Sequence, residues 1–224
     1  MMRDRMYGSF VMQTSPTVQS LPLASVATAA EAHAQSESLL ELEVPGLAQS
    51  IRQACLGEAD LVPYRVRQAL NQALDRASTD RLVNTIMLMP YSTQTYSRHL
   101  LYADPAGMFT VVALRWDPTQ GSPVHAHYTW CAYRVLSGVL SESHFEYDRA
   151  AEQAYLFNRV TRAAGQSVCG HGGMDFIHRL HNEGDKTVVS IHVYGIDAAR
   201  MSTHVNRMMA VSLRVETPSQ APRK

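Results

Sequence analysis

The chain has 224 residues, enough to bury a full-sized hydrophobic core in one domain. Basic and acidic residues number 20 each, so the basic excess usual in nucleic-acid-binding proteins is absent. No apolar run reaches the roughly 18 residues of a membrane-spanning helix. The three cysteines are odd in number and widely spaced, which disfavours a disulfide framework. We expect a cytoplasmic protein that binds neither nucleic acid nor membrane, as a monomer or weak homo-oligomer.

Residues 1–36 differ in composition from the rest, being rich in Ala, Ser, Thr and Val without a sustained period. Two arginines precede a mildly apolar stretch, as in a secretory signal, but residues 21–30 are mostly Ala, Ser and Thr, which is weak for a signal core. We interpret residues 1–36 as a disordered or loosely attached extension. A start site assigned too far upstream would look the same. Residues 37–224 are expected to form a single domain.

Residues 37–90 carry apolar side chains at helical spacing. Gly57 suits the end of a first helix, and Pro63 suits the start of a second. The repeating positions are Leu47, Ile51 and Cys55, then Val66, Leu70 and Leu74, then Leu82, Val83 and Ile86.

Residues 91–224 instead hold short β-rich runs. The run at 109–114 leads into a turn-like segment, and no long helical pattern interrupts the later runs. Those later runs lie near 128–136, 139–147, 155–162, 175–181 and 187–194. The spacing predicts an all-β barrel or sandwich, with the helical segment packed against it.

Two histidines alternate with an alanine at His125-Ala126-His127. Residues at i and i+2 of a strand point to the same face, so both imidazoles can reach one point inside a barrel. A metal ion is the usual reason to aim two neutral imidazoles together. Two surface histidines on a solvated strand would give the same pattern, so the motif alone does not decide.

The residues after this motif resemble the first motif of the cupin superfamily. Cys131 follows His127 after three residues, where a cupin has a Glu ligand, and Gly138 follows after six more. The second cupin motif ends in a His followed after three residues by Asn, which His178 and Asn182 match. The resemblance implies a mainly β cupin barrel, that is a double-stranded β-helix or jelly roll, with a third ligand at His178.

The cysteine at the Glu position changes the expected chemistry. The common non-haem iron oxygenase site has two His and one carboxylate. A neutral three-His site keeps the full charge of a divalent ion, which suits an anionic thiolate, and leaves three octahedral positions open. Zinc can also fill such a site, so iron does not follow from the histidines alone.

Four segments together resemble the cysteine dioxygenase family of thiol dioxygenases. They occur in the family's order between about Tyr96 and Tyr194. They are Tyr96-Ser97-Arg98-His99-Leu100, the His125–Cys131 block with Trp130, His178-Arg179 with Asn182, and Ser190-Ile191-His192-Val193-Tyr194. The resemblance implies Fe(II), held by three His, and oxidation of a small thiol by O₂ to a sulfinic acid.

The resemblance also implies catalytic roles beside the metal. Ser190, His192 and Tyr194 share one strand face and can hydrogen-bond in a row that ends at the Tyr194 hydroxyl. An ordinary phenol titrates near pH about 10, so Tyr194 should keep its proton and donate a hydrogen bond. Some members carry a thioether between Cys and Tyr at the positions of Cys131 and Tyr194, which we expect here. The alternatives are a merely polar strand face and an inert buried thiol.

Arg98 bears on the substrate, because a guanidinium can hold a carboxylate in a two-pronged fork. In the family an Arg here implies a cysteine-like substrate, with Tyr96 aiding the carboxylate. Oxidation of 3-mercaptopropionate or mercaptosuccinate, a surface role for Arg98, and a non-catalytic cupin that senses a ligand remain alternatives. We expect His144 at the surface and reject His181 as a ligand, because it faces away from His178.

Overall fold

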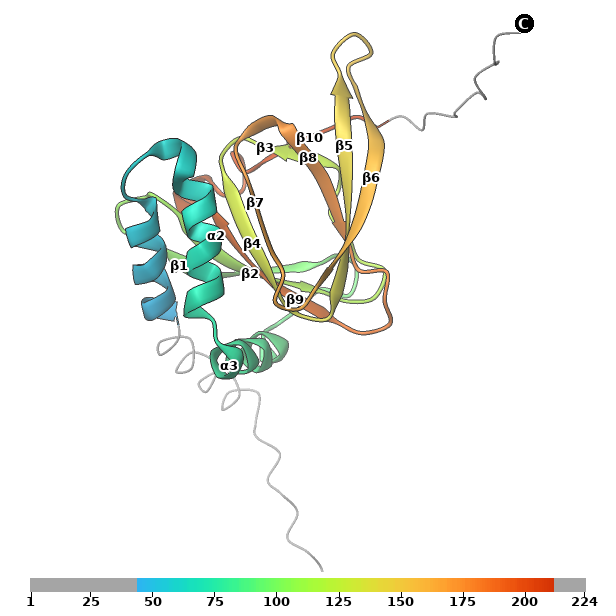
Figure 1. Cartoon of the computed structure of the whole chain (residues 1–224). Coiled ribbons are helices and arrows are strands. Elements are labelled where there is room, and N and C mark those ends of the chain that lie inside the picture. The colour runs from blue at the N-terminus through green and yellow to red at the C-terminus, as the bar shows by residue number, and fades with distance from the viewer. Residues whose placement is uncertain (1–43, 212–224) are drawn as a thin grey trace, which may run out of the picture.

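The computed structural model describes residues 44–211. The expected extension, residues 1–36, lies outside the described residues, so its character stays a prediction. Helices come first in the chain and strands follow, as predicted (Figure 1). The helical elements are residues 44–55, the 3₁₀ turn η1 (Ala59–Leu61), α2 (Val62–Ala73) and α3 (Arg76–Leu88), with a late 3₁₀ turn η2 (Ala198–Arg200).

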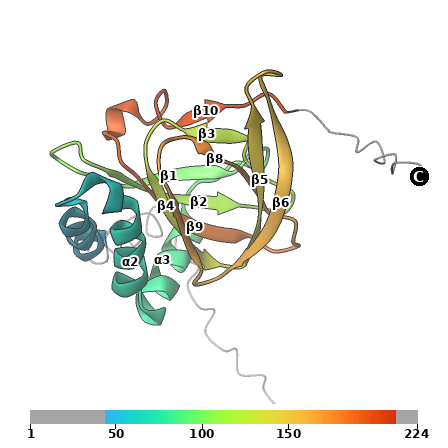
Figure 2. The same ribbon diagram turned by 45° about the horizontal axis from the view of Figure 1, so that its top comes forward.

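Within residues 44–211, ten strands form two five-stranded sheets in which all neighbouring strands are antiparallel. The first sheet, in spatial order, holds β1 (Ser97–Ala103), β2 (Thr110–Trp116), β9 (Val188–Tyr194), β4 (Cys131–Ser137) and β7 (Ser167–Gly170). The second holds β10 (Asn206–Met208), β3 (His125–His127), β8 (Gly173–His181), β5 (Val139–Asp148) and β6 (Gln153–Ala163). The two sheets face each other and enclose a barrel (Figure 2). The fold is the mainly β cupin barrel expected from the motifs.

The helices cover the outer face of the first sheet, where α2 packs on β4 and β7 (Figure 2). Strand β2 is buried along its whole length because both of its faces are covered. Val111 and Ala113 pack toward the helices, whereas Val112 and Leu114 belong to the cluster inside the barrel. This alternation follows from the two-residue period of a strand, and it makes the sheet a wall between two cores.

Seven of the nine apolar helical positions predicted from the sequence are buried in the core, and Cys55 and Val83 are partly buried beside it. Val66, Leu70 and Ile86 are fully buried against the outer face of the first sheet. Asp75 caps α3 by accepting a hydrogen bond from the backbone N–H of Ser78. All three cysteines, which lie within residues 44–211, are free.

The strand pattern differs from the prediction in two ways. The run expected near 128–136 begins only at Cys131, because a turn separates it from β3. Strands β1, β7 and β10 were not predicted; β7 and β10 have four and three residues, too few to display an alternation. Within residues 44–211, no helix has the length and apolar character needed to cross a membrane.

Candidate metal centre

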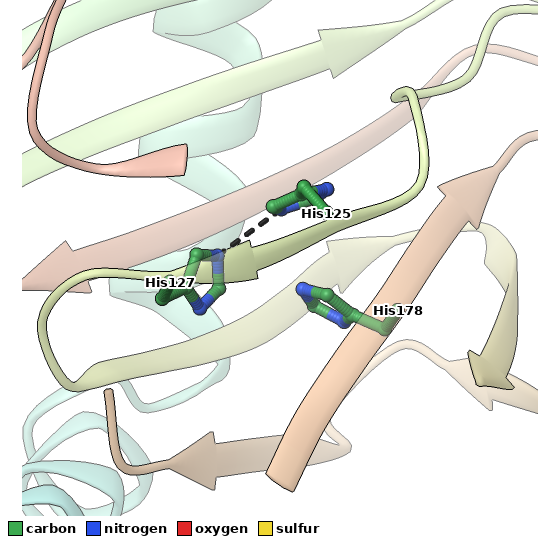
Figure 3. Close-up of side chains that lie close together, drawn as sticks. All are labelled: His125, His127 and His178. Carbon is green, nitrogen blue, oxygen red and sulfur yellow. Dashed lines mark hydrogen bonds between the residues drawn. The ribbon is translucent and has the colours of Figure 1, made fainter. Parts of the chain in front are cut away.

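Three imidazoles converge inside the barrel (Figure 3). His125 and His127 project from β3, and His178 projects from β8, where it pairs directly with His125 across the sheet. All three side chains are buried, and one ligand atom from each lies within 4.8 Å of the others. The structure therefore brings together the two histidines of the His-x-His motif and the third one that the cupin resemblance pointed to on a distant strand.

The nitrogen atoms of the three imidazoles are placed so that one metal ion could bind all of them. Nε2 of His125 and Nε2 of His127 lie 3.1 Å apart. Two nitrogens at about 2.1 Å from one ion, in neighbouring octahedral positions, are separated by about 3 Å. Nε2 of His178 is buried and has no hydrogen-bond partner among residues 44–211. An ion bound by these three histidines would satisfy that nitrogen, so the donor set fits a divalent transition metal.

The surroundings keep the imidazoles of His125 and His127 neutral, as metal ligands must be. Burial, with a contribution from His178, lowers the pKa of His125 to about 3. Burial also lowers the pKa of His127 well below its usual value, with His178 and His125 adding to the effect. Both rings therefore present lone pairs at neutral pH.

Hydrogen bonds orient two of the rings. Nδ1 of His125 lies 2.9 Å from the carbonyl oxygen of Pro123. Nδ1 of His178 lies 2.8 Å from a carboxylate oxygen of Glu142, which is fully buried on β5. A carboxylate can only accept, so Nδ1 of His178 is the donor, which leaves Nε2 as the nitrogen available to a metal.

Glu142 has two further neighbours, an arginine and a histidine. Nε of Arg162 donates to its second oxygen at 2.7 Å, and Nε2 of His144 lies 3.3 Å from that oxygen. Burial alone would raise the pKa of Glu142, but the nearby His144 ring and the hydrogen bonds from His178 and Arg162 lower it overall. The surface position expected for His144 is wrong, because its side chain packs toward this buried carboxylate and is only 17% exposed. No local sequence pattern predicts the role of Glu142.

A chain of hydrogen bonds leads from the barrel core to the phenol of Tyr194. Nε1 of Trp116 donates to Oγ of Ser190 at 2.9 Å, and that oxygen lies 2.9 Å from Nε2 of His192. Nδ1 of His192 lies 3.4 Å from the Tyr194 oxygen. If Ser190 donates its one proton to His192, Nδ1 carries the imidazole proton and the Tyr194 hydroxyl is free to donate into the pocket. Trp116 is an anchor of this row that the sequence did not reveal.

Tyr133 holds His192 from the side. The two rings stack at 4.9 Å with an angle of 12° between their planes. Burial lowers the pKa of His192 well below its usual value, with His178 adding to the effect, so the ring stays neutral. Burial raises the pKa of Tyr194, and the Cys131 thiol adds to this, so its phenol keeps its proton.

Cys131 and Tyr194 are directly opposite each other on the antiparallel strands β4 and β9. Both side chains are buried, and they belong to the same apolar cluster. Burial raises the pKa of the Cys131 thiol well above its usual value. The strand register therefore places opposite each other the two residues between which the sequence predicts a thioether, and the bond itself stays a prediction.

Arg98 and Tyr96 line the cavity that contains the three imidazoles. Tyr96 is stacked on Trp116 with ring centroids 4.5 Å apart, and one guanidinium nitrogen of Arg98 donates to the Tyr96 oxygen at 3.2 Å. Both residues also line a wider outer cavity of about 550 Å³ that adjoins the first. Arg98 is exposed, but it stands at the mouth of the site rather than on an unrelated surface.

Two antiparallel sheets closed into a barrel, with a buried three-histidine cluster inside, define this chain as a cupin with a metal-binding site. It belongs to the cysteine dioxygenase type I family, which it matches over residues 63–204.

Solved structures with similar folds include three of low sequence identity. A protein from Thermus thermophilus has 16% identity and a TM-score of 0.40, over 50% of this chain and 92% of that chain. An oxalate oxidase in complex with the substrate analogue glycolate has 13% identity and a TM-score of 0.38, over 47% of this chain and 53% of that chain. A cupin superfamily protein from Desulfitobacterium hafniense has 11% identity and a TM-score of 0.36, over 50% of this chain and 86% of that chain.

Proposed function

We propose that this chain is an iron(II) thiol dioxygenase that converts L-cysteine, or a closely related thiol bearing a carboxylate, and O₂ into the sulfinic acid. The observation that carries the proposal is one cavity lined by His125, His127 and His178 together with Arg98 and Tyr194. A passive metal-binding cupin has no need of a cation and a protonated phenol around the same space. The reaction balances, because both atoms of O₂ are added to one thiol sulfur.

Iron is proposed because the family acts on thiols and O₂, and because a three-His set leaves positions open for both. When bound, iron(II) supplies a Lewis acid that favours the thiolate form of the substrate and a redox-active centre for O₂. His125, His127 and His178 would hold it as neutral ligands. Glu142 would fix the orientation of His178.

The remaining residues would position the substrate and the transferred oxygens. Arg98 would pair with the substrate carboxylate through two parallel hydrogen bonds, with Tyr96 beside it. Tyr194 would hold a proton at its hydroxyl and donate a hydrogen bond toward the oxygen atoms that reach the sulfur. Ser190 and His192 would keep that hydroxyl in place.

We also propose a thioether between Cys131 and Tyr194. The bond would join the cysteine sulfur to a ring carbon beside the phenol oxygen. Its formation removes one hydrogen atom from each residue, a two-electron oxidation for which O₂ is the acceptor. Holding the phenol by a covalent bond would raise activity by fixing its orientation, without being required for turnover.

Oxygen uptake by the iron-loaded protein tests the proposal. L-cysteine, 3-mercaptopropionate, mercaptosuccinate and cysteamine would be compared in parallel, with mass analysis of the products. We expect uptake with a carboxylate-bearing thiol, giving a product heavier by two oxygen atoms. Iron-containing protein that consumes no O₂ with any of the four would refute this substrate assignment and favour the non-catalytic cupin.

A further inference from the structure

A polar atom without a partner lies at the mouth of the site. Asn206 stands on β10, opposite His127 in the antiparallel register. Its side-chain Oδ1 is buried, and residues 44–211 offer it no hydrogen-bond partner. A buried amide oxygen that stays unpaired destabilises the protein, so natural proteins rarely keep one without a use. The atom is free to accept a hydrogen bond from a bound molecule.

Asn206 also has a distinctive location. It lines the inner cavity with the three imidazoles and the adjoining outer cavity, and it shares this double position only with Tyr96 and Arg98 among the residues lining the two. These three residues form a collar between the metal centre and the mouth. A small thiol whose sulfur lies beside the three imidazoles would have these three residues next to its other polar groups.

The collar offers complementary hydrogen-bonding chemistry. The guanidinium of Arg98 has donors and no acceptor, so it selects a carboxylate. Oδ1 of Asn206 is an acceptor, so it selects an N–H or O–H group. A thiol that carries a carboxylate and an amine on the same carbon supplies both partners. A thiol acid without the amine would leave Oδ1 unpaired, and such a loss discriminates strongly between ligands.

We propose that Asn206 is a specificity-determining residue, which accepts a hydrogen bond from the amino group of a 2-amino thiol acid and selects it over thiol acids that lack the amine. This inference rests on the proposed function, since it names the substrate class of the same site. An amine nitrogen that also contacts the metal keeps N–H groups, so the two contacts are compatible.

The test compares L-cysteine with 3-mercaptopropionate, which differs only by the absent amine. For the iron-loaded wild type, Asn206→Ala and Asn206→Asp, kcat/KM would be measured by oxygen uptake. Dissociation constants for both thiols would be measured by anaerobic calorimetry. Asn206→Ala should lower kcat/KM for cysteine, and raise its dissociation constant, by about tenfold to a hundredfold. Both quantities should change little for 3-mercaptopropionate. Asn206→Asp keeps an acceptor and should retain the preference for cysteine.

Ser202→Ala is the matched control, because Ser202 lines only the outer cavity and should leave both thiols unaffected. Equal losses on both thiols in Asn206→Ala would overturn the proposal. If Asn206→Asp lost activity and affinity with both thiols, the proposal would also be overturned, because Asn206 would then be donating to the carboxylate through its side-chain nitrogen. If the thiols bound without being oxidised, and the preference for cysteine still depended on Asn206, the proposed dioxygenase activity would be refuted and this inference would stand. Absence of binding by either thiol would overturn both.

Discussion

The buried carboxylate of Glu142 accepts a hydrogen bond from Nδ1 of His178 at 2.8 Å, although 36 residues separate them in the chain. Strands β5 and β8 are neighbours, and their register brings the two side chains to the same interior face. An imidazole that donates to a carboxylate is both fixed in its tautomer and more basic at its other nitrogen. Glu142 is therefore a positioning residue for the proposed metal, acting through His178.

Glu142→Gln should lower iron affinity by about tenfold to a hundredfold, because the neutral amide accepts a weaker hydrogen bond from His178. The measurement is competition for iron(II) with a chelator of known affinity, under anaerobic conditions. Glu146→Gln is the matched control, since Glu146 lies on the same strand but is exposed. Equal affinities of the Glu142 variant and the wild type would remove Glu142 from the site.

His178→Ala should abolish stoichiometric iron loading, because two imidazoles alone hold a divalent ion weakly. Iron content per chain after anaerobic reconstitution is the measurement, with circular dichroism to show that the variant is folded. His181→Ala is the control on the same strand, since His181 Nε2 lies 2.9 Å from the carbonyl oxygen of Thr119. A fully loaded and active His178 variant would refute the ligand assignment.

The site was predictable from the sequence wherever its residues follow local spacing. His125 and His127 are two residues apart, as are Ser190, His192 and Tyr194, so a strand brings each set to one face. Glu142 and Asn206 could not be found this way. Each reaches the site through a pairing between distant strands, β5 with β8 and β10 with β3, and register between strands depends on contacts that no local pattern records.

The barrel itself was predictable from the frequency of short β-rich runs and from the cupin motifs. Its shortest strands were not, because three or four residues carry no measurable period. His144 was misplaced for a related reason. An isolated polar residue on a strand is ordinarily exposed, but His144 lies directly opposite His178 and two residues from Glu142, so the strand register places it on their inward face.

Arg98→Ala should lower kcat/KM for L-cysteine and mercaptosuccinate by about tenfold or more, because the carboxylate loses its charged partner. Cysteamine lacks a carboxylate and should be affected much less. Oxygen uptake with each thiol gives the ratio of kcat/KM for L-cysteine to kcat/KM for cysteamine. Arg207→Ala provides a control for general loss of positive charge, since Arg207 is an exposed residue of β10. An unchanged ratio in the Arg98 variant would exclude a contact with the carboxylate.

Cys131→Ala should prevent the proposed thioether and lower the turnover rate without abolishing it. Intact-protein mass spectrometry checks the bond directly. Protein that has turned over thiol should be lighter by two hydrogen atoms in the wild type and unchanged in Cys131→Ala and Tyr194→Phe. Cys169→Ala is the matched control, because Cys169 lies on β7 opposite Ala132 rather than opposite Tyr194. A wild-type mass without any loss after prolonged turnover would contradict the crosslink.

The metal-free protein should become less stable as pH falls below about 6.5, the ordinary pKa of histidine. Burial lowers the pKa of His125 to about 3, and it lowers those of His127 and His192 as well. Such groups bind protons in the unfolded chain before they bind them in the folded one. Stability is therefore fully present above pH about 6.5 and is lost toward the folded pKa, by at most about 1.4 kcal/mol per pH unit for each histidine.

Urea unfolding of the metal-free protein between pH 7.5 and 5.5, pH values chosen to span roughly that ordinary pKa, measures this slope. His125→Gln should reduce the slope, because one group with a lowered pKa is removed. His204→Gln should leave it unchanged, since His204 is exposed. Glu142 does not contribute to the slope between pH 7.5 and 5.5, because its lowered pKa affects stability only below about pH 4.3. A free energy of unfolding that does not change across this range would mean that the three histidines are not buried in the metal-free protein, which would then have an open site.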